Sequence, residues 1–138
     1  MSYATKANLI KRFGQQELID RTDRSDPPLD VIDDAVLQLA MDRADADADD
    51  ALRSQYSVPV ASPPISLLTH VENRARRYLY DDGMPQSVKD GNDEATEWFK
   101  SVAKGVIRLS VPLAATGTPG AIGNAMFEET FNDFARAY

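Results

Sequence analysis

Residues 30–64 read DVIDDAVLQLAMDRADADADDALRSQYSVPVASPP and form the longest stretch of the chain that can make one uninterrupted element. No proline or glycine occurs between Pro28 and Pro59. Apolar residues recur at steps of four and three, which places them on one side of a helix. These residues are Leu37, Met41, Ala44, Ala48 and Ala51 or Leu52. The pattern predicts one long helix.

This expected helix has two unlike faces. Asp30 is a suitable N-cap, and the proline after Val58 pushes that residue out of the helical region and ends the helix. The apolar face is mostly alanine in its second half, which lets a partner helix approach to the lower end of the roughly 8–10 Å interaxial range. The opposite face is expected to stay in solvent and carries Asp34, Gln38, Asp42, Asp45 and Asp49.

The composition limits the classes of function. The chain has 138 residues, enough for one domain with a modest core. Its formal net charge of −7 argues against a sequence-independent grip on nucleic-acid phosphates. The absence of cysteine excludes disulfides and thiolate chemistry. Neither a signal-peptide pattern nor an apolar run of about 18 residues is present, so we expect a soluble protein with no membrane partner.

Two short helices are predicted before the long one. Thr5 suits an N-cap, and Gly14 suits the left-handed residue at which helices commonly end. Residues 15–22 then predict a second short helix with Leu18 and Ile19 turned inward. The prolines at 27 and 28 break this helix and lead into the long one.

Two more helices are predicted after an extended, proline-rich crossover with the sequence SVPVASPP. The first runs from the prolines at 63 and 64 to about Tyr80. The second starts near Asp93, after a polar turn, and continues to Leu109. Its inward residues are Ala95, Trp98, Phe99, Val102, Val106 and Leu109. The expected fold is an all-α helical bundle with one long acidic helix, the crossover and a flexible C-terminal arm.

Two surface features predict contacts with other chains. Lys100, Lys104 and Arg108 form a basic edge at steps of four, which can meet an acidic helix within one subunit or across two. Residues 1–109 are expected to form the helical domain, and residues 110–138 an arm that begins as a Gly- and Pro-rich linker. The end of the arm carries an aromatic stripe, namely Phe127, Phe131, Phe134 and Tyr138. This stripe either folds back on its own core or docks in a groove of another chain.

No set of residues predicts a catalytic, cofactor or metal site. The run at residues 45–50 lacks the glycine and the closing glutamate of an EF-hand, and on a helix Asp47 points away from Asp45 and Asp49. His70 is the only histidine and has apolar neighbours, which favours packing over general-base work. There is no GxSxG turn and no Gly-rich phosphate loop. We therefore expect no enzyme and no cofactor.

Five blocks occur in a characteristic order: YATKANLIKRFG, ELIDRTD, D-x-x-L-x-x-x-Y with VPV and PP, R-x-R-x-x-LY, and WFKSVAKG. This order resembles a family of small proteins from Mu-like phages and prophages, related in role to head-tail connector or head-completion proteins. The likeness covers roughly Ser2 to Leu109, and the C-terminal aromatic segment is a looser match. It departs from the family at Ala48, where a larger aliphatic is usual, and at the turn of residues 90–92. The matching residues are Tyr3, Leu9, Phe13, Gly14, Asp49, Leu52, Tyr56, Pro59, Arg74, Arg77, Leu79, Tyr80, Ala103, Lys104 and Gly105.

The resemblance implies a structural virion protein of the phage neck, present in the host cytoplasm during assembly. It implies a homo-oligomeric ring of about a dozen copies below the portal protein, which contacts the next neck or tail-completion protein. DNA would pass through such a ring without specific binding. A lumen lined by Asp42, Asp45 and Asp49 would repel phosphates over a screening length of about 8–10 Å.

Two other classes of function stay open. An acidic protein of this size can act as a DNA mimic that inhibits a host nuclease, and it would then bind a basic host protein as a monomer or dimer. A helical, metal-dependent phosphohydrolase would lose its activity when Asp45 and Asp49 are changed to Asn.

Overall fold

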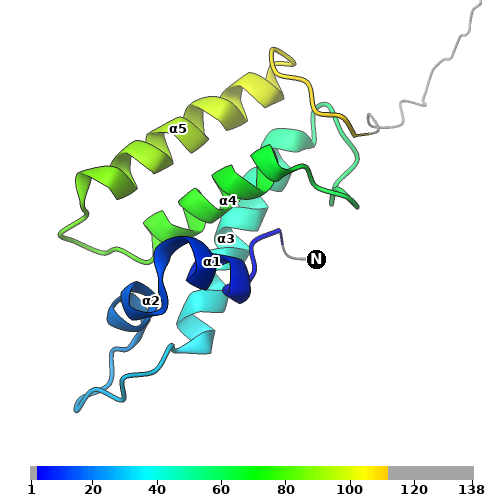
Figure 1. Cartoon of the computed structure of the whole chain (residues 1–138). Helices are drawn as coiled ribbons and strands as arrows, with labels where there is room; N and C mark the ends of the chain where they lie inside the picture. The colour runs from blue at the N-terminus through cyan, green and yellow to red at the C-terminus, as the bar shows by residue number, and fades with distance from the viewer. Residues whose placement is uncertain (1–2, 112–138) are drawn as a thin grey trace, which may run out of the picture.

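The computed structural model describes residues 3–111, which form five helices and no strand (Figure 1). Their bounds are α1 Lys6–Phe13, α2 Gln15–Thr22, α3 Asp34–Leu52, α4 Ile65–Tyr78 and α5 Gln86–Ala103. Helices α3, α4 and α5 pack on one another, and the short α1–α2 pair lies against α3 and α4. The prediction of an all-α helical bundle is confirmed. None of the five helices combines the length and apolarity needed to cross a membrane.

Helix α3 is the predicted long helix, but both of its expected ends are wrong. Its N-cap is Asp33, whose carboxylate accepts hydrogen bonds from the backbone N–H groups of Ala35 and Val36 at 3.0 and 3.3 Å. Asp30 lies in the preceding loop with a φ of 57°, and its N–H donates a hydrogen bond to the Asp23 carboxylate at 2.8 Å. At the other end the helix stops at Leu52, well before Val58.

The predicted alanine packing of α3 is confirmed. Ala44 and Ala48 are fully buried, as are Ala75 of α4 and Ala95 of α5. Small side chains on all three helices let their backbones approach closely, and buried leucines of α1 to α4 complete the core. The fully buried leucines are Leu9, Leu18, Leu52 and Leu67, with Leu37 almost as buried.

The α1–α2 pair follows its predicted caps and is fastened to α4 by arginines. The Thr5 hydroxyl accepts a hydrogen bond from the Asn8 N–H at 3.2 Å, and Gly14 separates the two helices with a φ of 92°. Arg76 donates two hydrogen bonds to the Glu17 carboxylate, at 2.7 and 2.8 Å. Bidentate pairs of this kind fix orientation as well as distance.

Helix α5 begins earlier and ends earlier than predicted. It starts at Gln86, so the predicted polar turn around Gly91 is helical, and Gly91 faces the side chain of Asn73 in α4. The helix ends at Ala103 because Gly105 is left-handed, with a φ of 77°. The N–H of Gly105 donates to the Val102 carbonyl and that of Val106 to the Ser101 carbonyl, the bonds of a Schellman motif. Val106 is consequently exposed instead of facing inward.

Candidate interaction surfaces

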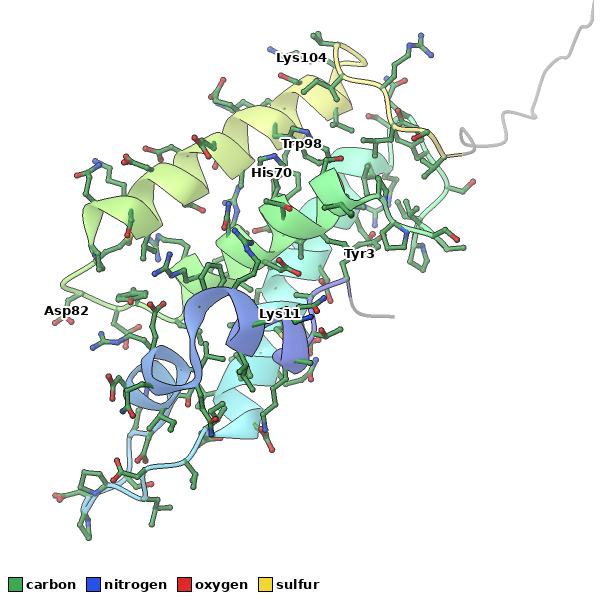
Figure 2. All side chains as sticks on the ribbon, in the orientation of Figure 1. Tyr3, Lys11, His70, Asp82, Trp98 and Lys104 are labelled. Atoms are coloured by element: carbon green, nitrogen blue, oxygen red, sulfur yellow. The ribbon has the colours of Figure 1, made fainter. Side chains whose placement is uncertain are left out.

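The predicted acidic stripe of α3 is not a continuous exposed surface. Asp42 is exposed, but Asp45 is only 8% exposed and Asp49 is half-buried. The Asp45 carboxylate accepts hydrogen bonds from the backbone N–H groups of Tyr3 and Ala4, at 3.1 and 3.3 Å. The prediction of a solvent-facing Asp45 is therefore wrong, because the start of the chain lies across this face of α3 (Figure 2).

Tyr3 joins three separate segments of the chain. Its hydroxyl donates to the Asp49 carboxylate at 2.6 Å and accepts from the Val60 N–H, in the α3–α4 connection, at 2.9 Å. Burial, followed by the hydrogen bond to Asp49, raises the pKa of Tyr3 to about 12. This role could not be predicted from local sequence, since the partners lie more than forty residues from Tyr3.

Asp47 lies on another side of α3 and contacts α4. It accepts a hydrogen bond from the Tyr78 hydroxyl of α4 and lies 3.9 Å from Nε of Arg74. The guanidinium of Arg43 covers the Tyr78 ring at 4.2 Å. Asp45, Asp47 and Asp49 thus hold other segments in place. Within residues 3–111, no group of three or more His, Asp or Glu side chains is arranged to hold a metal ion.

The predicted basic edge is divided by the end of α5. Lys100 is on the helix, Lys104 is its C-cap, and Arg108 lies beyond Gly105, so the three do not share one helical flank. All three are exposed, and Lys100 pairs with Glu97 at 3.6 Å. In the described part of the chain no ion pair joins these three side chains to α3. The basic edge therefore does not pair with the acidic helix of the same subunit in this part of the chain.

An open groove of about 550 Å³ lies between α4 and the outer face of α5. Its floor is a stack of the His70 and Trp98 rings, with centroids 4.8 Å apart and an interplanar angle of 27° (Figure 2). Ile107 closes one end, and Ser101 contributes a hydroxyl. Carboxylates line the other end, namely Asp93, Glu94 and Glu97. The prediction that Trp98 is a core residue is only half right, because its ring also forms part of this open surface.

His70 packs as predicted, and its environment disfavours its charged form. Burial lowers the pKa of His70 below 6.5, the nearby charge of Arg12 lowers it further, and Glu94 opposes both. Its Nδ1 atom is buried and has no hydrogen-bond partner among the described residues. Sequence periodicity could not reveal this groove. It identifies the apolar face of a helix, but it does not show whether another element covers that face.

The four residues of the aromatic stripe lie outside the described residues, and their proposed contacts stay predictions: Phe127, Phe131, Phe134 and Tyr138.

A family model described as "Bacteriophage Mu, Gp36" matches residues 3–128. The chain belongs to this family. The match begins at Tyr3, the residue that joins three segments, and extends past Leu109 into the part of the chain where the resemblance seen in the sequence is looser. The Gp36 family supports a role as a phage structural or morphogenesis protein. No curated protein matches the chain.

Proposed function

We propose that this Gp36-family protein is a head-tail connector, a non-enzymatic component of the virion neck. In this role, copies of the chain form a ring below the portal protein, extend the DNA channel and offer a surface to the next neck or tail-completion protein. The observation that carries the proposal is the family match over residues 3–128. The net charge of −7 supports it, because a channel for DNA should not bind phosphates.

The buried carboxylates sharpen this proposal. Asp45 and Asp49 hold Tyr3 and are unsuited to line a lumen, which leaves Asp42 as the exposed member of the predicted stripe. The same observation weakens the DNA-mimic alternative, since mimicry needs carboxylates in solvent at phosphate-like spacing.

Electron microscopy of the particle neck tests the proposal. We expect a ring of this protein coaxial with the portal, and purification of the free chain with isolated portal. A protein that is missing from purified particles and instead binds a basic host protein as a monomer would contradict the connector role.

The aromatic stripe gives a second, separable test. The full-length variant Phe127→Ser, Phe131→Ser, Phe134→Ser should lose attachment to the portal while its helix content stays unchanged by circular dichroism. The matched control changes two residues away from the stripe, Ala125→Ser and Asn132→Ser, and should attach normally. Normal attachment of the triple variant would mean that the stripe does not contact the portal.

A further inference from the structure

The groove between α4 and α5 is an apolar surface with carboxylates at one end. Its floor presents the rings of His70 and Trp98, and Ile107 lies where the chain leaves α5. Within residues 3–111, no segment covers it, and open apolar patches of this kind mark contact surfaces. Of its lining residues only the three carboxylates at one end are charged, and its occupant has to be identified.

We propose that residues 124–138 of the same molecule occupy this groove in the free protein. The inference concerns the chain before assembly and does not depend on the connector role. Ile107 is already part of the groove, and the described chain ends four residues later at Val111. Residues 112–123 can span up to about 40 Å when extended. The 18-residue α5 is about 27 Å long, so this tether is longer than the helix beside which the segment would lie.

The chemistry of the segment fits the floor of the groove. In NAMFEETFNDFARAY, aromatic residues recur at steps of four, three and four, which gives one aromatic face if the segment is helical. Phenyl rings stack or meet edge to face with indole and imidazole rings in preference to open solvent. The groove supplies both rings on one floor, so three phenylalanines of the segment can bury their rings against it.

The charges determine the direction of the segment. Along α5, Asp93, Glu94 and Glu97 precede the exposed cations Lys100 and Lys104. Along the C-terminal segment the order is reversed: Glu128, Glu129 and Asp133 come first, and its only basic residue, Arg136, comes last. A chain that returns from Val111 enters at the basic end and runs antiparallel to α5. This direction brings opposite charges to each end, whereas the parallel direction would bring like charges together.

Trp98 reports occupancy directly, because it is the only tryptophan of the chain. The full-length variant Phe127→Ser, Phe131→Ser, Phe134→Ser should shift the Trp98 emission to longer wavelength and make it several-fold more accessible to acrylamide. The control Ala125→Ser, Asn132→Ser should match the wild type. Both results should be independent of protein concentration. Identical Trp98 signals in the wild type and the triple variant would overturn the proposal. Protection of wild-type Trp98 that is lost on dilution would also overturn it, because the groove would then hold the segment of a second copy.

A charge exchange tests the direction. Lys100→Glu with Lys104→Glu should expose Trp98 to acrylamide as the triple variant does, and adding Glu128→Lys with Glu129→Lys should restore the protection. Both cations are exposed, so the exchange leaves the helical core intact. Failure of the second pair to restore protection would overturn the antiparallel placement. The experiment uses only the free protein, so its outcome is distinguishable from that of the portal-binding test.

Discussion

The carboxylate face of α3 and the outer face of α5 are exposed to solvent in the opposite way from what their side chains suggest. The α3 face is charged, yet Asp45 is buried against the backbone of Tyr3 and Ala4. The α5 face carries Trp98, yet it borders an open groove. A carboxylate can be buried where it satisfies backbone N–H groups that would otherwise lack a partner, and an apolar face stays open until a further segment covers it. Exposure therefore depends on partners as well as on polarity.

Replacing Asp45 should have the largest effect on stability. Asp45→Ala removes a buried carboxylate that accepts hydrogen bonds from the N–H groups of Tyr3 and Ala4, which should lower the free energy of unfolding by about 3 kcal/mol. Urea denaturation measures this change. The exposed Asp42 on the same helix is the matched control, and Asp42→Ala should stay within about 0.5 kcal/mol of the wild type. Equal effects of the two substitutions would show that Asp45 is not held by the start of the chain.

Removing the hydroxyl of Tyr3 should have the next largest effect. Tyr3→Phe deprives Asp49 of a donor and leaves the N–H of Val60 without an acceptor, which should cost about 1–2 kcal/mol in urea denaturation at neutral pH. Tyr56→Phe is a useful comparison, because its hydroxyl accepts only from the Leu109 N–H at 2.8 Å in a half-buried position. A Tyr3→Phe variant that is no less stable than the wild type would contradict the role of Tyr3 as a junction.

The pKa of Tyr3 adds a pH dependence to this comparison. Because burial raises its pKa from 10.0 to about 12, the neutral phenol stabilises the fold fully below pH 10. This contribution is lost as the pH rises from 10 to about 12, since the unfolded chain releases the proton first. The wild type should therefore lose about 2 kcal/mol more than Tyr3→Phe over that interval. Parallel stability curves for the two proteins would exclude a raised pKa at Tyr3.

The sequence predicted the elements better than their ends and partners. Local signals were sufficient for α1, where Thr5 and Gly14 cap the helix as expected, and for the alanine face of α3. The burial of Asp45 could not be predicted, because its partners are backbone groups more than forty residues away. The end of α5 was different, since Lys104-Gly105 is a C-terminal signal present in the sequence, and helical periodicity to Leu109 concealed it.

Replacing Gly105, at the end of α5 beside the groove, should have a smaller effect on stability. Gly105→Ala places a side chain at a φ of 77°, which should destabilise the protein by about 1 kcal/mol in urea denaturation. Gly91→Ala is the matched control inside α5. Alanine is favoured in a helix, and the added Cβ would meet the Asn73 side chain at 3.4 Å, so no comparable loss is expected. A neutral Gly105→Ala would mean that the left-handed residue does not set the end of α5.

The last prediction concerns the pKa of His70. Two substitutions in the groove should shift this pKa in opposite directions. Trp98→Ala removes the ring that buries His70, so the pKa of His70 should rise toward 6.5, whereas Glu94→Gln removes an opposing charge and should lower the pKa further. Titration of the His70 ring protons by NMR measures both.

The lowered pKa of His70 also sets a direction for stability. The unfolded chain binds a proton near pH 6.5 while the folded chain does not, so stability is complete above that pH and falls as the pH drops toward the folded pKa. Trp98→Ala should weaken this acid dependence and Glu94→Gln should strengthen it. A shift of the same sign in both variants would show that the His70 pKa reflects a change in the fold and not the two neighbours named.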